Sequence, residues 1–217
     1  MTRITIDVVS DTVCPWCFIG KRRLEAALAA RPVVDADVRW RAYQLNPDMP
    51  AEGMDRKAYV TAKFGSDERA RALYETVRSA GATAGLDFQF DRIERAPNTL
   101  ASHRLIRWAG SAGCQDAVVE ALFAAYFFDG RDLGDKSVLV DVARQAGMDA
   151  GLVGDLLDQG RDVALVAQEV ATARGMGITG VPCFIFDGKS AVQGAQDADV
   201  LVQIIDQLTG QEATAAG

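Results

Sequence analysis

Apolar and polar residues at the start of the chain follow a pattern that predicts a strand, a helix and a second strand. Residues 3–9 are rich in β-branched side chains, and apolar residues then recur at helical spacing over residues 15–30. Residues 38–45 alternate between apolar and polar and predict the second strand. Two strands joined by a helix of this length form a βαβ unit, in which the strands run parallel.

The middle of the chain has helical periodicity throughout. The stretch Asn46–Pro50 breaks the preceding pattern, and glycine or proline residues then separate the expected helices from one another. We expect helices over residues 55–64, 67–84, 98–112, 116–128, 136–146, 149–158 and 161–174.

A second pair of strands follows this helical block. Residues 183–186 and 191–193 flank Asp187-Gly188, which is a hairpin turn signal. A helix over 197–208 closes the pattern, and the last residues have the composition of a frayed tail. The order is therefore βαβ, a helical block and then αββα, which indicates an α/β protein with a large helical insertion.

Charge and composition restrict the partners of this protein. The chain has 217 residues and a net charge of −7, which argues against nucleic acid or an anionic membrane as a partner. No run approaches the ~20 apolar residues of a membrane span. Asp7 stands within the first apolar stretch, so the N-terminus does not have the pattern of a secretory signal peptide, and we expect a cytoplasmic protein.

The residues Cys14-Pro15-Trp16-Cys17 stand between the first strand and the first helix. A strand that turns into a helix at Cys14 places this thiol at the N-cap, where unpaired backbone N–H groups and the helix dipole favour a thiolate. Pro15 suits the first helical position, because its missing N–H would have no partner there. Cys17 falls on the third helical position, so its N–H can point at the Cys14 sulfur. This pattern indicates redox chemistry.

Two other uses of a Cys-x-x-Cys pair fit this sequence less well. A structural zinc site needs four ligands, whereas Cys114 and Cys183 stand alone and His103 is the one histidine in the sequence. We therefore expect no metal. A permanent disulfide between Cys14 and Cys17 would close a very short loop and would constrain the unfolded chain little.

The Cys-x-x-Cys at the start of the first helix and Gly180-Val181-Pro182 before the third strand resemble the DsbA-like branch of the thioredoxin fold. The chain is similar to the FrnE-type group within it, which are thiol-disulfide oxidoreductases with an inserted helical domain. The segments that carry the resemblance are Ser10–Cys17, Pro97-Asn98-Thr99 with His103-Arg104, Gly177–Pro182, and Asp187-Gly188 with Val192–Gln196.

The resemblance implies an α/β thioredoxin fold with a large all-helical insertion between strand 2 and the helix preceding strand 3. Residues 1–50 and 175–210 would then form a discontinuous thioredoxin-like domain. Residues 51–174 would form the helical insertion domain, and residues 211–217 a tail.

The resemblance also implies roles for individual residues. In this fold the proline before the third strand is cis and faces the Cys-x-x-Cys, so Val181–Pro182 is the expected cis bond. The Val181 backbone would bind an extended substrate segment, and Trp16 would complete the substrate-binding residues with Val181 and Pro182. Family members often carry a buried acid on the first strand that exchanges a proton with the second cysteine. Asp7 is therefore a candidate proton relay, its alternative being a solvated strand-edge carboxylate.

Several other side chains are expected to be structural. Lys21 is expected on a solvated helix face, Cys183 in the core and Cys114 packed in a loop. His103 is expected to be a hydrogen-bonded structural histidine rather than a general base. A group of aromatic residues should fill the core of the helical block, with part of it lining a groove above Cys14: Trp108, Phe123, Tyr126, Phe127 and Phe128.

Three functions follow from these patterns. The leading one is an enzyme, a thiol-disulfide oxidoreductase, in which Cys14 attacks a protein or small-molecule disulfide and Cys17 resolves the mixed disulfide. It needs no bound cofactor, and glutathione is a candidate co-substrate. The second is a glutathione-dependent transferase or isomerase of the kappa and 2-hydroxychromene-2-carboxylate isomerase type. Those relatives usually carry serine in place of Cys14 and lack a residue equivalent to Cys17. The third is a holdase that binds unfolded chains without redox turnover.

Overall fold

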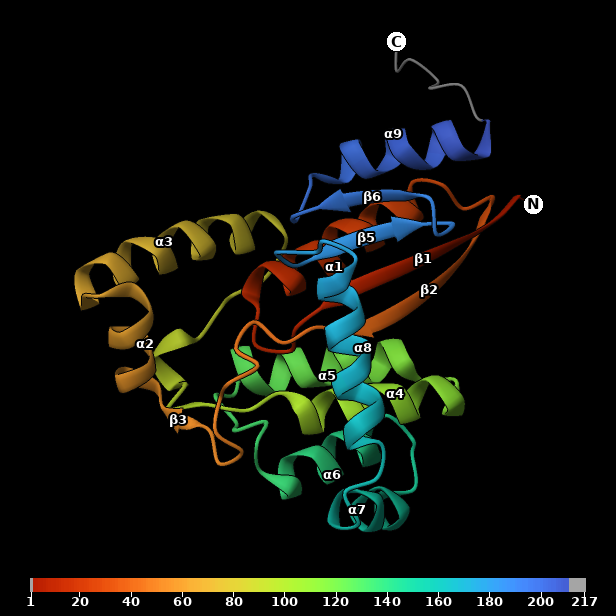
Figure 1. The fold of residues 1–217 in the computed structure, drawn as a ribbon. Helices are drawn as coiled ribbons and strands as arrows, with labels where there is room; N and C mark the ends of the chain where they lie inside the picture. The colour runs from red at the N-terminus through yellow and green to blue at the C-terminus, as the bar shows by residue number, and fades with distance from the viewer. Residues whose placement is uncertain (1, 211–217) are drawn as a thin grey trace.

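The computed structural model describes residues 2–210, and its elements follow the predicted order (Figure 1). The main sheet has the strand order β2-β1-β5-β6. Its strands are β1 (Thr2–Ser10), β2 (Val34–Ala42), β5 (Cys183–Phe186) and β6 (Ser190–Gln193). β1 and β2 run parallel, whereas β5 is antiparallel to both β1 and β6.

Helix α1 (Pro15–Ala29) connects β1 to β2, and α9 (Ala198–Thr209) follows β6. The other helices lie between β2 and β5 in the chain. They are α2 (Arg56–Phe64), α3 (Asp67–Thr83), α4 (Leu100–Ala112), α5 (Gln115–Phe127), α6 (Lys136–Gln145), α7 (Ala150–Asp158) and α8 (Val163–Gly175). This block also holds the short antiparallel pair β3 (Met54–Asp55) and β4 (Arg95–Ala96) and the 3-10 turn Phe90–Arg92.

Strand β2 begins and ends earlier than the pattern over residues 38–45 predicted. Its parallel register pairs Thr2 with Val34 and Ser10 with Ala42, so β2 matches the whole length of β1. The Tyr43 N–H still donates to the Ser10 carbonyl at 3.0 Å. Pairing with β1 therefore sets the ends of the second strand more strongly than its own alternation.

Different helices cover the two faces of the sheet. Ile6 and Val8 of β1 share a buried cluster with residues of α1 and α9. Val9 and Cys183 point to the opposite face and pack with Ala173 of α8. Figure 1 shows α8 crossing this second face, with α4 and α5 beyond the β2 edge of the sheet. The site at the start of α1 therefore lies on the α1 face, close to the inserted helices.

Phe18 joins α1 to the inserted helices. This residue has no exposed surface, and its ring stacks on Phe123 with centroids 4.9 Å apart. The rings of Phe127 and Phe128 lie 6.3 and 5.4 Å away. The expectation of an aromatic core in the helical block is confirmed for these residues. The core continues from the sheet into the helices, and the division into two domains remains a prediction.

Lys21 corrects one expectation from the sequence. Its side chain is only 3% exposed, although a solvated helix face was expected. The ammonium pairs with Glu25 one turn along α1 and with Asp116 and Glu120, at 3.0 and 3.2 Å, from α5. Burial lowers the pKa of Lys21, but these carboxylates more than offset that effect and raise it overall. Helix α5 covers this face of α1, and no local sequence pattern around Lys21 indicated that contact.

Within residues 2–210, no helix has both the length and the apolar character needed to cross a bilayer.

Candidate active site

Cys14 and Cys17 begin helix α1 as predicted. Cys14 is the N-cap residue with an extended backbone, and Pro15 takes the first helical position. The Cys14 N–H donates to the Asp11 carbonyl at 3.0 Å, which fixes the turn out of β1. The Cys17 N–H donates to the Cys14 carbonyl at 3.0 Å rather than to the Cys14 sulfur, so the expected N–H to sulfur contact is absent.

The two thiols have different environments. Both are free, but Cys14 is 4% exposed and lines a cavity, whereas Cys17 has no exposed surface. Burial raises the pKa of the Cys17 thiol well above its ordinary value, and the hydrogen bond and charge of the adjacent Cys14 raise it further. A hydrogen bond with the Asp11 backbone lowers the pKa of Cys17, and the Asp11 carboxylate raises it. Cys17 is therefore the protected thiol of the pair.

The loop before β5 faces this pair of thiols. The Val181–Pro182 peptide bond is cis, and the Cys14 Sγ lies 3.7 Å from the Val181 carbonyl oxygen. Gly20 of α1 permits the close approach, because a Cβ there would lie 2.8 Å from Pro182 Cγ and 3.1 Å from Phe184 Cζ. The structure thus brings Val181 and Pro182 to Cys14.

A cavity of about 240 Å³ opens beside Cys14. Trp16 lines it next to the thiol, and the aromatic floor includes Tyr126 and Phe127. This confirms that part of the aromatic set borders a groove at Cys14. The far wall comes from α2 and α3, so a molecule in this cavity would touch both the dithiol and the inserted helices.

Two cations, Arg56 and Lys63, line this cavity, and neither has a carboxylate partner among the described residues. Arg56 donates to the Tyr74 hydroxyl at 2.6 Å and to the Tyr126 hydroxyl at 3.4 Å. Among the side chains that the structure describes, no carboxylate pairs with Arg56. Tyr59 and Lys63 also line the cavity, because positions 56, 59 and 63 lie on one face of α2. This group was not predicted, although its residues have the i, i+3, i+7 spacing of one helix face in the sequence.

Asp7 does not lie with the dithiol. It points to the face of β1 opposite Ile6 and Val8 and pairs with Arg41 at 2.7 Å, with a 24% exposed side chain. β1 is also a central strand, so Asp7 is not at a strand edge either. Each successive residue of a strand changes face, so the face of a carboxylate depends on its exact position in the strand.

The acid that does lie beside the dithiol is Asp11. Its side chain is 1% exposed, and its Oδ2 accepts from the Leu45 N–H at 2.7 Å. Its backbone contacts both cysteines, as described above. Asp11 belongs to the segment Ser10–Cys17 that carried the family resemblance, but no role was predicted for it.

The second segment of the resemblance, at the start of α4, holds the Asp11 loop in place. The hydroxyls of Thr12 and Ser102 hydrogen-bond to each other at 2.8 Å, and both residues are buried. The next residue, His103, lies with its Nε2 3.4 Å from the Asp11 Oδ1. The expectation that His103 is hydrogen-bonded is not met, because this nitrogen has no hydrogen-bond partner among the described residues.

The remaining cysteines lie apart from the dithiol. Cys183 is fully buried on the opposite face of the sheet, as predicted, and burial raises the pKa of its thiol. Cys114 is half-buried at the N-cap of α5. Within residues 2–210 no group of three or more potential ligands is arranged to hold a metal ion.

Alkylation should distinguish the two thiols of the pair. When the reduced protein reacts with iodoacetamide between pH 7 and 9, we expect Cys14 to be modified first. Cys17 has no exposed surface and its raised pKa keeps it a thiol over this range, and a thiol reacts far more slowly than a thiolate. Peptide mass spectrometry measures both sites, with urea-unfolded protein as the control in which they react alike. Faster modification of Cys17 would reverse the assignment.

Known proteins are similar to this chain over most of its length. A solved structure of a probable DsbA oxidoreductase from Streptomyces coelicolor is 32% identical, with 99% of this chain and 93% of that chain covered and a TM-score of 0.85. The cytosolic disulfide reductase DsbM from Pseudomonas aeruginosa, solved with GSH, is 20% identical, with 94% and 98% covered and a TM-score of 0.65. An uncharacterized Bacillus subtilis protein, YwbO, is 26% identical, with 93% of this chain and 96% of that protein covered.

The family comparison covers nearly the whole chain. Residues 5–206 match the model of the DSBA-like thioredoxin domain. The expected thioredoxin fold with inserted helices is thereby confirmed, together with the resemblance to the DsbA-like branch of that fold. The chain belongs to the DSBA-like thioredoxin domain family, whose activity is thiol oxidoreduction.

Proposed function

We propose that this protein is a thiol-disulfide oxidoreductase that uses Cys14 as the attacking thiol and Cys17 as the resolving thiol. The observation that carries the proposal is the asymmetry of the pair. Cys14 lines a cavity. Cys17 lies next to Cys14 and is fully buried, and its raised pKa means that it holds its proton more tightly than an ordinary thiol does. Such a pair can form a mixed disulfide at the accessible sulfur and then release the partner by internal attack.

The chemistry balances in two steps. The Cys14 thiolate attacks a disulfide R–S–S–R, so that a Cys14–S–R bond forms and one RS⁻ leaves and takes a proton from solvent. Cys17 then loses its proton and attacks the Cys14 sulfur. The Cys14–Cys17 disulfide forms and the second RS⁻ leaves. The dithiol is oxidised by two electrons and the substrate is reduced by two, and the reverse sequence oxidises a substrate dithiol.

We further propose glutathione as a small co-substrate that binds in the cavity beside Cys14. The cavity offers an arginine without an acidic partner, hydroxyls of Tyr59 and Tyr74, and the Val181 carbonyl near the thiol. A peptide thiol that carries two carboxylates has matching groups, because an arginine fork suits a carboxylate. The GSH present with DsbM supports the same choice. That protein is cytosolic, and we propose the cytoplasm for this one as well.

Replacement of Arg56 tests both the reaction and the co-substrate. Wild-type protein, kept reduced by a coupled thiol reductant, is expected to reduce glutathione disulfide with turnover. Arg56→Gln should raise KM for glutathione disulfide about 10-fold, since a charge-assisted contact is worth roughly 1.5–3 kcal/mol and Arg56 is only half-buried. Steady-state kinetics with glutathione disulfide and with neutral 2-hydroxyethyl disulfide provide the measurement.

The neutral disulfide separates loss of binding from loss of chemistry. Its reduction should stay within about twofold of wild type in Arg56→Gln, because the dithiol is untouched. Arg69→Gln, an exposed arginine on α3, is the matched control and should change neither substrate. If Arg56→Gln lost the same activity with both disulfides, the proposal that glutathione binds at Arg56 would be contradicted. If the wild-type protein turned over neither disulfide, the proposed oxidoreductase activity would be contradicted.

A further inference from the structure

Two buried polar atoms near the dithiol have no hydrogen-bond partner. They are the Asp11 Oδ1 and the His103 Nε2, and they are the two such side-chain atoms found among the described residues. They lie 3.4 Å apart, and both side chains are only 1% exposed. Buried polar atoms are almost always paired, because an unpaired one costs about 1–3 kcal/mol. Two unpaired atoms at this separation are close enough to share a proton.

The other contacts of Asp11 leave this one oxygen free. Its Oδ2 accepts from the Leu45 N–H at 2.7 Å. The Asp11 carboxylate also acts on Cys17, whose pKa it raises through its negative charge. Asp11 is therefore tied to the dithiol through its backbone, which hydrogen-bonds to Cys14 and Cys17, and its side chain lies beside His103. Because Asp11 is 1% exposed, a proton that it accepts from Cys17 has no direct route to bulk water.

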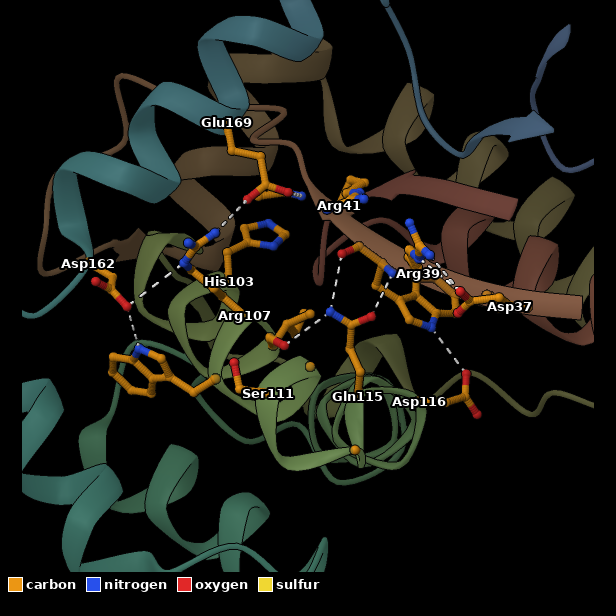
Figure 2. A pocket seen from close by; sticks show the side chains of 17 residues that line it. Asp37, Arg39, Arg41, His103, Arg107, Ser111, Gln115, Asp116, Asp162 and Glu169 are labelled. Atoms are coloured by element: carbon orange, nitrogen blue, oxygen red, sulfur yellow. Dashed lines mark hydrogen bonds and ion pairs between the residues drawn. The ribbon is translucent and has the colours of Figure 1, made fainter. Parts of the chain in front are cut away.

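His103 also lines a second cavity, of about 670 Å³, which Cys14 does not line. The cavity lies between the edge strand β2 and helices α4 and α8, and Figure 2 shows the His103 imidazole among its lining side chains. The charged groups that line it are paired or neighbour one another across these elements: Asp37, Arg39, Arg41, Arg107, Asp116, Asp162 and Glu169. The Nε2 of His103 thus lies next to Asp11, and His103 also lines an open polar cavity.

We propose that His103 carries protons between Asp11 and this cavity during the resolving step. The inference rests on the proposed function, since it gives the path for the proton that Cys17 must lose. Cys17 passes its proton to the Asp11 carboxylate as its sulfur attacks Cys14, and the Cys14–S–R bond breaks. The proton moves from Asp11 to His103 Nε2, and the imidazole releases one from its other nitrogen to water in the cavity. In the oxidising direction the same path delivers a proton to Cys17.

An imidazole suits this task for a physical reason. It has two nitrogens, and either can hold a proton near neutral pH, so that one can accept while the other donates. An amide of similar size fills the same space without relaying a proton. His103 touches no reacting atom, so it acts through Asp11 as a positioning and relay residue. Asp11 itself touches Cys17 through its backbone and acts on the thiol through the charge of its carboxylate.

The test follows the two chemical steps separately. Reduced wild-type protein and His103→Gln are mixed with glutathione disulfide, quenched with acid and analysed by mass spectrometry for the Cys14–glutathione adduct and the Cys14–Cys17 disulfide. In His103→Gln we expect an unchanged rate of adduct formation and an about 10-fold slower resolution, within the range for loss of a proton-transfer group. Added imidazole should restore the resolving rate in proportion to its concentration. Arg107→Gln, a cavity variant with a 44% exposed side chain, should behave as wild type.

A structural role for His103 predicts a different pattern. Slow resolution that imidazole does not restore, or resolution as fast as in wild type, would overturn the relay and leave the oxidoreductase standing. Failure of wild type to form the Cys14–Cys17 disulfide would overturn the proposed function itself. If His103→Gln does not fold, the relay can still be tested in the wild-type protein by NMR. The sequence has a single histidine, so ¹⁵N labelling of histidine reports on His103 alone. The nitrogen shifts of His103 should differ between the dithiol and disulfide states, and identical shifts would contradict the relay.

Discussion

Cys17→Ser is expected to trap substrates, and Cys14→Ser to abolish activity. Without Cys17 the Cys14 sulfur can still attack a disulfide, but nothing releases the mixed disulfide that forms. Proteins linked to Cys17→Ser should therefore accumulate in cells and disappear from non-reducing gels when a reductant is added. Cys14→Ser should trap nothing and should lose turnover with glutathione disulfide to background, a loss of at least about 100-fold, because the nucleophile is gone.

The other cysteines provide the controls for this result. Cys114→Ser and Cys183→Ala should retain turnover within a few-fold of wild type. Cys114 lies at the start of α5, and Cys183 lies on the opposite face of the sheet. A glutathione transferase or isomerase needs one side chain at position 14 to hold the glutathione thiolate. Full turnover by Cys17→Ser, with no trapped partner, would therefore exclude the dithiol mechanism and favour that alternative.

Phe18→Ala is expected to cost about 3–5 kcal/mol of unfolding free energy, the range for loss of a fully buried aromatic ring. Phe18 has no exposed surface, and its ring lies against Phe123, Phe127 and Phe128 of the inserted segment. Its loss would leave a cavity where the active-site helix meets the insertion. Urea unfolding followed by circular dichroism measures the change, and the thermal midpoint should fall by roughly 10 °C for a chain of this length.

An exposed apolar residue is the matched control for Phe18. Leu152→Ala removes a side chain from a residue that is 56% exposed on α7 and should cost well under 1 kcal/mol. If Phe18→Ala unfolded no more easily than Leu152→Ala, the ring would not hold α1 to the insertion. A biphasic transition in Phe18→Ala alone would show that the same contact also makes the two parts unfold together.

The local sequence was sufficient to predict where and how α1 starts. The strand pattern before Cys14, the proline after it and the helical spacing beyond Cys17 all act within a few residues of one another. Their outcome, a cysteine N-cap followed by proline at the first helical position, is the one found. The hairpin at Asp187-Gly188 was predicted for the same reason, because a short turn determines the pairing of its flanking strands; three residues, 187–189, separate the paired Phe186 and Ser190.

The identity of the buried acid could not be predicted in this way. Asp7 and Asp11 both precede the dithiol, and spacing alone does not say which one points at it. The pairing of β1 directs Asp7 to the far face beside Arg41. The turn after Ser10 brings Asp11 back beneath Cys14 and Cys17. The choice depends on register and on where the strand ends, which are the least certain parts of a pattern-based prediction.

Contacts between segments that lie far apart in the chain could not be predicted from the sequence pattern either. Lys21 has the spacing of a surface lysine, yet α5 supplies two carboxylates that cover it. Arg56 becomes part of the site only because α2 folds back over Cys14. His103 meets Asp11 across a large separation in the chain. The helical insertion thus supplies side chains that complete the site, and only the three-dimensional arrangement places them.

The central claim is that Cys14 and Cys17 form one reversible two-electron couple. A redox titration tests it most directly: Cys114→Ser/Cys183→Ala protein is equilibrated with mixtures of reduced and oxidised glutathione, acid-quenched and analysed by mass spectrometry. We predict a single transition that follows a two-electron dependence on the ratio of [GSH]² to [GSSG], with Cys14 and Cys17 oxidised together and the mixed disulfide a minor species. Accumulation of a stable glutathione adduct on Cys14, with Cys17 left as a free thiol throughout, would contradict the account.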